Sequence, residues 1–370
     1  MSRRARHVRL AAIVGATVFL AGCAVGGGTP TDLEPDQDLA PLPPLSELET
    51  LANPAGYLGE STAVLRQTSI VPIADDPTPE LPVTVTDSQG TDVTVTSADR
   101  ILALDIYGSL SATVYGLGLG DRLVGRDVST GFPGTEDLPL VTQNGHEING
   151  EKVLELAPTV VLTDTTIGPW DVFLQLRDAG IPVVVVDSHR DMDNVGDIVT
   201  QVADALGVPD QGRALAERVE GEIAAKVAEI ASIAPKNEAD RVRMLFLYVR
   251  GNAGIYYLFG EGSGADSLID ALGGVDVATE VGWQGMKPVN AEALVSMEPD
   301  LILMMTKGLE SVDGVDGLLE RVPAVASTPA GINRRIVDMS DYEILSFGPR
   351  TADVLDALAR AIYAPEANAQ

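Results

Sequence analysis

Histidine is scarce in this chain, so each one is a candidate for acid–base or metal chemistry. Only three of the 370 residues are histidine, and His7 lies in the basic N-terminal stretch. His146 lies in the polar loop 142–150, and His189 follows an apolar strand predicted over 183–186. Imidazole is a frequent metal ligand and proton carrier near neutral pH. Taken alone, however, a histidine in such a polar segment is most often simply solvated.

Tyr248 and Arg250 form a second candidate pair, near the end of a strand predicted over 244–249. Residues two apart in a strand point to the same face of the sheet. The guanidinium of Arg250 can therefore donate a hydrogen bond to the Tyr248 oxygen and favour the phenolate. This help matters because free tyrosine has a pKa of about 10. Taken alone, a tyrosine at a strand end is more often an aromatic side chain at the edge of the core.

The composition excludes several other kinds of chemistry. The formal net charge is −29, and so acidic a chain repels phosphate backbones, so we expect no nucleic-acid partner. A single cysteine, Cys23, excludes a disulfide framework and a thiolate metal cluster. The chain has no Gly-x-Ser-x-Gly and no His-Glu-x-x-His, and 260–265 resembles a phosphate-binding loop only superficially. We therefore do not expect an enzyme.

The N-terminus has the pattern of a signal peptide over 1–22. Four arginines within 3–9 precede an uncharged apolar run over 10–21. This run is too short to span a bilayer, which needs about 20 apolar residues. It ends in Leu20-Ala-Gly-Cys23, which resembles the lipobox of bacterial lipoproteins. The resemblance implies that Cys23 is lipidated and anchors the chain at the extracytoplasmic face of the cell membrane.

Residues 23–80 are predicted to form an acidic tether rich in proline and glycine. Three consecutive glycines, 26–28, lie near its start, and prolines recur from position 30 to position 79. Such a composition buries too little apolar surface to become fully ordered.

The remaining residues, 81–370, are enough for two lobes that each bury a core. Short apolar runs over 160–162 and 183–186 are typical of parallel strands covered on both faces. They alternate with predicted helices, and this alternation indicates an α/β fold.

The second half of this region repeats the first. The pattern that begins Asn149-x-Glu151 returns 141 residues later as Asn290-x-Glu292, and the segment 179–187 returns as 330–338. Because both echoes occur in the same order, we expect two related lobes over 81–208 and 233–370.

One long helix is predicted between the lobes, over 209–232. Pro209 suits the first position of a helix, and Pro235 ends it. A single apolar stripe runs along the helix at spacings of three and four residues. The stripe consists of Leu215, Val219, Ile223, Val227 and Ile230. Two lobes joined by one helix must leave a cleft between them.

A lipoprotein leader, two related α/β lobes and one connecting helix resemble the substrate-binding proteins of bacterial ABC importers. The repeated motif and Ala-Leu-Gly-Gly at 271–274 are typical of the helical-backbone class, class III, which handles haem, siderophores and cobalamin. Gly145-His146, Tyr248-x-Arg250-Gly251 and the segment 251–264 resemble the haem-binding branch, the HmuT-type lipoproteins of actinobacteria. The resemblance implies two Rossmann-like lobes and a non-enzymatic protein that delivers haem b to an ABC permease dimer with its ATPase.

The resemblance also implies site residues. In that branch a histidine of the first lobe and a tyrosine of the second bind the haem iron from opposite faces, which implies His146 and Tyr248, supported by Arg250. Ferric iron accepts an anionic phenolate well, and imidazole is a common axial ligand. Candidates for the pocket wall are Tyr256, Tyr257, Trp283, Met286 and Met305, with Met304 beside them. Unranked candidates for binding the propionates are Arg126, Lys287 and Lys307. His189 is expected to be solvated.

Glu151 and Glu292 occupy corresponding positions at the starts of two predicted helices, where a negative charge also stabilises the helix dipole. In the family one glutamate of each lobe docks onto permease arginines, which implies these two. The main alternative is a receptor for ferric siderophores or corrinoids that uses no protein iron ligand. Other surface haem-binding proteins are further candidate partners, as sources of the haem.

Overall fold

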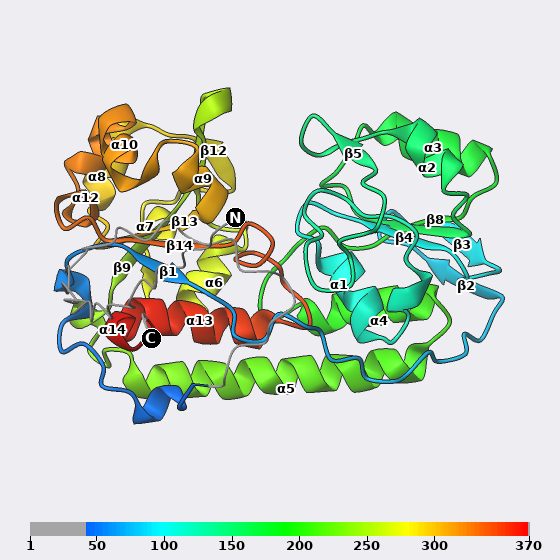
Figure 1. Ribbon diagram of the computed structural model, residues 1–370, viewed down its shortest axis with the longest axis horizontal. Coiled ribbons are helices and arrows are strands. Elements are labelled where there is room, and N and C mark those ends of the chain that lie inside the picture. The colour runs from blue at the N-terminus through cyan, green and yellow to red at the C-terminus, as the bar shows by residue number, and fades with distance from the viewer. Residues whose placement is uncertain (1–41, 369–370) are drawn as a thin grey trace, which may run out of the picture. The chain divides into compact units, whose positions relative to one another are not determined.

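Two α/β lobes and a long helix that runs along both of them make up the part of the chain that the structure describes (Figure 1). This computed structural model describes residues 42–368, which belong to one unit. The predicted fold class, two α/β lobes joined by one long helix, is confirmed. Residues 1–41, with the predicted signal peptide, Cys23 and the start of the predicted tether, lie outside the described residues. Within 42–368, no helix is long and apolar enough to cross a membrane.

A parallel sheet of three strands, in the order β4-β7-β8, forms the centre of the first lobe. All residues of these three strands are buried, as expected for a parallel sheet covered on both faces. Two hairpins, β2-β3 and β5-β6, lie outside this sheet. The strands are β2 (Val83–Thr86), β3 (Asp92–Val95), β4 (Ile101–Leu104), β5 (Thr142–Gln143), β6 (Glu147–Ile148), β7 (Val160–Thr163) and β8 (Val183–Val185). The helices are α1 (Ser109–Gly116), α2 (Gly150–Glu155), α3 (Trp170–Asp178) and α4 (Val195–Ala205).

The second lobe contains a mixed seven-stranded sheet in the order β1-β14-β13-β9-β10-β12, with β11 also pairing with β9. Strands β10 and β12 are antiparallel to their neighbours, and the other pairings are parallel. The strands are β1 (Ser61–Ala63), β9 (Arg243–Arg250), β10 (Ile255–Phe259), β11 (Val275–Asp276), β12 (Met286–Pro288), β13 (Leu301–Met305) and β14 (Ile336–Met339). The helices are α6 (Ala265–Ala271), α7 (Val277–Glu280), α8 (Ala291–Met297), α9 (Thr306–Glu310), α10 (Gly314–Arg321), α11 (Pro323–Ala326), α12 (Pro329–Ile332), α13 (Thr351–Tyr363) and α14 (Pro365–Asn368).

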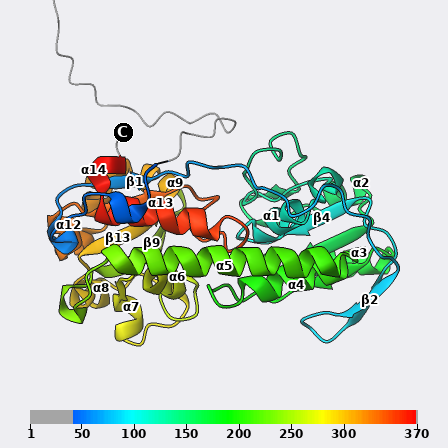
Figure 2. The same cartoon turned by 90° about the horizontal axis from the view of Figure 1, so that it is seen from below.

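Helix α5 (Pro209–Ile233) occupies the predicted connecting segment. Its 25 residues, at about 1.5 Å per residue, give a length of about 38 Å. Leu215, Val219, Ile223 and Ile230 of the predicted stripe are buried. They face α4 of the first lobe and α13 of the second, against which α5 packs. Figure 2 shows α5 running along both lobes.

Residues 42–80 are not the free tether that the sequence predicts. This segment, here called the N-terminal strap, contains β1, which pairs in parallel with β14 at the edge of the second-lobe sheet. Leu45, Leu65 and Ile70 of the strap are buried. The prediction failed because these apolar residues are isolated among prolines and acids and have no core of their own. They become buried only on a surface that the rest of the chain supplies.

The strap is bonded to both lobes. The amide of Leu51 donates to the carbonyl of Tyr363 in the second lobe at 2.8 Å, and the amide of Ile73 donates to the carbonyl of Gly116 in the first at 2.7 Å. Asp76 forms an ion pair with Arg122 of the first lobe at 2.7 Å. The chain therefore crosses between the lobes at the strap as well as at α5, which corrects the expectation of a single connection.

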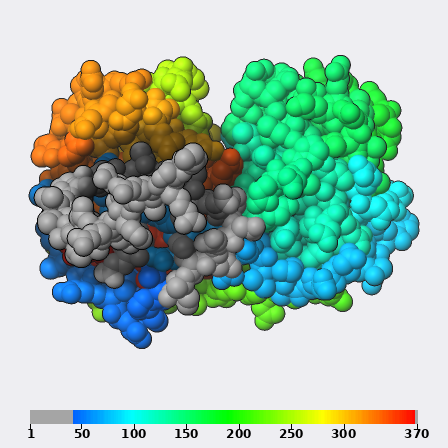
Figure 3. All heavy atoms as spheres, in the orientation of Figure 1, coloured from blue at the N-terminus to red at the C-terminus, as the bar shows by residue number. Residues whose placement is uncertain are grey.

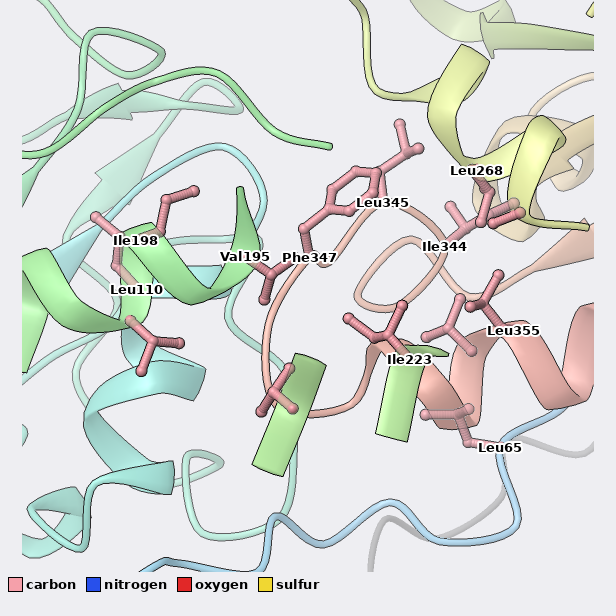
Figure 4. Close-up of a cluster of buried hydrophobic side chains, with 14 of the residues drawn as sticks. Leu65, Leu110, Val195, Ile198, Ile223, Leu268, Ile344, Leu345, Phe347 and Leu355 are labelled. Carbon is pink, nitrogen blue, oxygen red and sulfur yellow. The ribbon is translucent and has the colours of Figure 1, made fainter. Parts of the chain in front are cut away.

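One buried apolar cluster extends through both lobes, α5 and the strap (Figure 4). It includes Leu110 of the first lobe, Phe347 of the second, Ile223 of α5 and Leu65 of the strap. Because these side chains share one cluster, a change in the separation of the lobes would expose apolar surface to water. The packing therefore fixes the position of one lobe against the other.

Strand β9 divides its side chains between two environments, as the period of two requires. One face packs into the cluster shared by the lobes, and the other into a second cluster beneath the outer helices of the second lobe. The first face carries Met244, Phe246 and Tyr248, and the second carries Leu245, Leu247 and Val249. Tyr248 is only partly buried, because the shared cluster ends at the cavity that opens beyond it.

Arg335 holds the strap to the end of α13. Its guanidinium is buried and donates to Ser61 Oγ at 2.9 Å and to the carbonyls of Ala361 and Ile362 at 2.8 and 3.0 Å. It also lies 4.6 Å from the centre of the Tyr57 ring. The side chain therefore satisfies carbonyls at the C-terminus of α13 that lack helical partners.

We expect Arg335→Met to lower the free energy of unfolding by roughly 2–4 kcal/mol, because buried carbonyl groups lose charged donors. Urea denaturation of both proteins measures the change. Arg321→Met is the matched control, because Arg321 forms an exposed ion pair with Asp313 and its loss should cost no more than about 0.5 kcal/mol. Equal effects of the two substitutions would contradict the anchoring role of Arg335.

Candidate functional site

A cavity of about 560 Å³ is lined by residues of both lobes, and its size is typical of small-molecule sites, roughly 300–1,000 Å³. Most of its lining is apolar or aromatic, with a few polar groups that can orient a ligand. The first lobe contributes Ile106, Tyr107, Val128, Ser129, Gly145 and His146, and the second contributes Tyr248, Arg250, Tyr257, Phe259, Met286, Met305, Lys307, Asp341, Tyr342 and Leu345. Figure 3 shows the two lobes meeting along a furrow.

A tight hairpin turn between β5 and β6 carries His146. Asn144 and Gly145 have φ angles of 47° and 90°, a left-handed conformation that asparagine and glycine adopt most easily. Asn144 Nδ2 donates a hydrogen bond to Glu147 Oε2 at 3.0 Å. The Asn-Gly pair in the polar loop thus explains why the chain reverses here and brings His146 to the cavity.

His146 is partly buried in the cavity wall, and its Nδ1 lies 3.5 Å from Ser129 Oγ. Burial, and then the positive charge of Arg250, lower the pKa of His146 below its usual value. The imidazole is therefore neutral at pH 7 and has a lone pair to offer a metal.

Tyr248 lines the cavity from the second lobe. Its ring stacks on Phe259, with ring centroids 5.8 Å apart. Burial raises the pKa of Tyr248, and although Arg250 lowers it, Asp341 raises it further. The phenol therefore keeps its proton when no ligand is bound, and a metal that binds the oxygen has to displace that proton.

Arg250 does not donate to the Tyr248 oxygen, contrary to the sequence expectation. Both side chains are on one face of β9, but the guanidinium lies over the Tyr248 ring, 4.5 Å from its centroid. It donates instead to Asp341 Oδ1 at 2.5 Å and to the carbonyl of Val249 at 2.9 Å. A carboxylate is a stronger acceptor than a neutral phenol, so Asp341 takes the hydrogen bond. The cation still lies against the aromatic face, where the ring attracts it.

Strand pairing decides which of the predicted wall residues reach the cavity. Tyr257 lies opposite Tyr248, and Met286 lies opposite Phe259. Residues directly opposite each other share a face of the sheet, so all four side chains line the cavity. Met305, at the end of β13, also lines it.

Tyr256 and Trp283 do not line the cavity, and their prediction as wall residues is wrong. Tyr256 lies opposite Val249, so it points to the other face of the sheet and packs against the second cluster. Trp283 packs there too, and its Nε1 donates to the carbonyl of Leu258 at 3.2 Å. Met304 is fully buried in the same cluster.

The four remaining polar candidates differ in position. Lys307 lines the cavity. Lys287 Nζ lies 5.8 Å from the centroid of the Trp283 ring, which is outside the cavity lining. Arg126 donates to loop carbonyls of its own lobe. His189 is exposed and forms an ion pair with Asp191 at 2.7 Å. Of the three cations considered for propionates, only Lys307 is at the cavity.

Glu151 and Glu292 are exposed and lie outside the cavity lining, in the first turns of α2 and α8. Each helix has an asparagine N-cap: Asn149 accepts from the amide of Lys152 at 3.1 Å, and Asn290 accepts from the amide of Glu292 at 3.0 Å. The repeated sequence motif therefore folds into the same capped helix start in both lobes.

Sequence reasoning missed several lining residues. They are Ile106, Tyr107, Val128, Ser129, Phe259, Asp341, Tyr342 and Leu345. Tyr107 follows β4, and Asp341 and Tyr342 follow β14. Because ligands of open α/β sheets bind beyond the carboxyl ends of the strands, these positions could have been found from the strand ends.

A buried charged cluster supports the first-lobe wall. Asp105, Asp127, Asp164 and Arg190 are all at most 2% exposed. Asp127 accepts hydrogen bonds from the amides of Asp105 and Ser129 at 3.0 and 2.9 Å, and so fixes both loops that reach the cavity. Arg190 forms ion pairs with Asp105 and Asp164 at 3.4 and 2.8 Å. Burial and the nearby charge of Asp105 raise the pKa of Asp127 and of Asp164.

Known proteins of similar sequence and structure identify the family. Residues 106–343 match the periplasmic binding protein family. The crystal structure of heme binding protein HmuT matches with a TM-score of 0.81 and 40% identity, over 85% of this chain and 100% of that chain. That protein has also been solved with alanine in place of a histidine, and of a tyrosine and an arginine two positions apart.

Two further proteins are similar. Periplasmic heme-binding protein RhuT from Roseiflexus sp. RS-1 matches with a TM-score of 0.66 and 36% identity, over 74% of this chain and 100% of that chain. The uncharacterized ABC transporter substrate-binding lipoprotein YvrC of Bacillus subtilis (strain 168) is 25% identical over 295 residues, which cover 78% of this chain and 88% of that protein.

This chain belongs to the periplasmic binding protein family. Members of this family are substrate-binding components of transporters and not enzymes. The chain is therefore an extracytoplasmic binding protein.

The charged cluster makes stability depend on pH. Because its raised pKa values keep a proton that the unfolded chain releases above about pH 4, its contribution to stability falls as the pH rises from about 4 toward neutrality. We expect Asp127→Asn to flatten this dependence in urea denaturation between about pH 5 and 7. Asp121→Asn, at an exposed position, is the control and should keep the wild-type slope. An unchanged slope in Asp127→Asn would refute the assignment of the proton to this cluster.

Proposed function

We propose that this protein captures ferric haem, iron protoporphyrin IX, in the cavity between its lobes and delivers it to an ABC permease with its ATPase. The observation that carries the proposal is the position of His146 and Tyr248, which line one cavity from different lobes. Their side chains are an imidazole and a phenol, both known axial ligands of haem iron.

The rest of the cavity supports this ligand. Its walls are mainly apolar and aromatic, which suits a flat macrocycle. The lowered pKa of His146 leaves a neutral imidazole, ready to bind iron without losing a proton. The similarity to two proteins described as heme-binding, at 40% and 36% identity, points to the same ligand.

Tyr248 is proposed as the second axial ligand, bound as phenolate. Because its pKa is raised, the phenol holds its proton in the absence of ligand. The proton has to leave when Fe³⁺ binds the oxygen in its place. Arg250, over the ring of Tyr248, favours the negative charge that results, and its ion pair with Asp341 holds it in that place. The HmuT variants at a tyrosine and an arginine two positions apart match the spacing of Tyr248 and Arg250.

A titration with ferric haem, followed by absorption, tests the proposal. We expect a Soret band that saturates at one equivalent. We expect His146→Ala and Tyr248→Phe each to change the spectrum and weaken binding at least about tenfold, because each removes one iron bond. His189→Ala and Tyr256→Phe are matched controls, since neither residue lines the cavity, and they should behave as wild type.

Two outcomes of the titration would count against the proposal. If the wild-type protein gives no Soret shift beyond that of free haem, haem is not the ligand, and a ferric siderophore or a corrinoid becomes the better candidate. If haem binds but His146→Ala and Tyr248→Phe leave the spectrum unchanged, the choice of iron ligands is wrong.

The docking surface for the permease is proposed at α2 and α8. Both helices lie at the end of their lobe remote from α5 (Figure 1). Each exposes a glutamate, Glu151 or Glu292, and three residues later an apolar side chain, Leu154 or Val295, which are 47% and 39% exposed. Residues three apart on a helix share a face. Each lobe thus presents the same pair of a carboxylate and an apolar group, which suits a partner with two equivalent subunits.

We expect the double variant Glu151→Gln, Glu292→Gln to bind haem as wild type but to stimulate the ATPase of the reconstituted transporter at least about tenfold less, because paired charges at the interface are lost. The control is the double variant Glu155→Gln, Glu298→Gln, which changes exposed glutamates near the C-terminal ends of the same helices. Docking through α2 and α8 is wrong if both double variants stimulate the ATPase equally.

Membrane anchoring is proposed to occur through Cys23, which follows the signal-peptide pattern of 1–22. One of the similar proteins is named a lipoprotein, which supports this placement at the extracytoplasmic face of the cell membrane. Incorporation of a labelled fatty acid into the wild type but not into Cys23→Ser tests it, and equal labelling of both would exclude Cys23 as the attachment site.

A further inference from the structure

The charged side chains of the cavity wall carry a net positive charge. Arg250, Lys307 and Asp341 are the formally charged residues among the described lining residues. Asp341 is fully engaged, because Oδ1 accepts from Arg250 at 2.5 Å and Oδ2 accepts from the backbone amide of Lys307 at 2.9 Å. The ion pair neutralises Arg250 and leaves the ammonium of Lys307 as an excess positive charge. In a chain with a net charge of −29, a positive charge here favours an anionic ligand.

Lys307 and Tyr342 together present unused hydrogen-bond donors. Lys307 Nζ donates to the Tyr342 hydroxyl at 2.9 Å and lies 4.2 Å from the centroid of the ring. An ammonium has three donors, so two remain. Within residues 42–368, no acceptor takes the hydroxyl proton of Tyr342. An N–H of Lys307 and the O–H of Tyr342 are therefore available side by side, which matches the two oxygens of a carboxylate.

The ring of Tyr342 and the backbone of Lys307 are held in place by their surroundings. The ring of Tyr342 packs so closely on Gly131 of the first lobe that a Cβ there would lie 2.6 Å from ring atoms. The backbone of Lys307 is fixed by its bond to Asp341, while its side chain is exposed at the edge of the cavity. The donors therefore lie where the lobes meet, at the boundary between the apolar wall and water.

We infer that Lys307 and Tyr342 form a receptor for one carboxylate of the bound ligand. The inference rests on the proposed function, in which the ligand is haem and the carboxylate is a propionate. The macrocycle would then lie against the apolar wall with one propionate at the edge of the cavity, bonded to the ammonium and the hydroxyl. Lys287 and Arg126 are not at the cavity and have no such role.

Esterified haem provides the test. Ferric haem and its dimethyl ester present the same iron and macrocycle, but the ester has no carboxylate charge. We expect the wild-type protein to bind haem roughly tenfold more tightly than the ester, as fits one charge-assisted carboxylate contact. Lys307→Met combined with Tyr342→Phe should remove most of this preference by weakening haem binding alone, and the Soret spectrum should stay as in wild type.

Two controls separate charge from packing. Lys307→Arg keeps the positive charge and should retain most of the preference for haem over the ester. Lys287→Met removes a lysine outside the cavity and should change nothing. If Lys307→Met, Tyr342→Phe prefers haem over the ester as strongly as wild type does, the carboxylate receptor is refuted. Failure of the proposed function is a different result, because then neither porphyrin gives a Soret shift with the wild-type protein.

Discussion

The binding site depends on the packing that holds one lobe against the other. Its wall comes from both lobes, so the distance between His146 and Tyr248 is set by contacts far from either residue. Helix α5 packs on α4 and α13, and one apolar cluster continues through both lobes. The N-terminal strap adds hydrogen bonds to each lobe. A movement that opens the cavity must therefore expose buried apolar surface, and this cost favours one arrangement of the lobes.

The alternation of side chains along each strand separates the residues that pack in the core from the residues that line the cavity. On β9, even-numbered residues change from core to cavity along the strand, from Phe246 to Tyr248 and Arg250. Desolvation at this boundary sets the chemistry: it keeps the imidazole of His146 neutral and the phenol of Tyr248 protonated. The Arg250–Asp341 ion pair places a cation beside Tyr248, where it can stabilise phenolate after the proton has left.

The sequence predicted the fold, and His146 and Tyr248, the two residues it singled out, both line the cavity. It did not predict the partners made by long-range contacts. Repeated motifs and short apolar runs were enough for two lobes and a connecting helix. His146 was a candidate because histidine is scarce and because the surrounding residues resemble a known family. Asp341, which lies 91 residues from Arg250, could not be foreseen as its acceptor. The choice between Tyr256 and Tyr257 depends on the register of β10 against β9, and a slip of one residue would exchange them. The strap packs only on surface formed by distant segments.

We propose that one iron atom is bound between His146 of the first lobe and Tyr248 of the second. A crystal structure of the haem complex, with anomalous diffraction measured at the iron absorption edge, tests this most directly. We expect one iron peak within bonding distance of an imidazole nitrogen of His146 and of the Tyr248 oxygen, with the macrocycle in the cavity. An iron bound by neither residue, or by residues of one lobe alone, would contradict it.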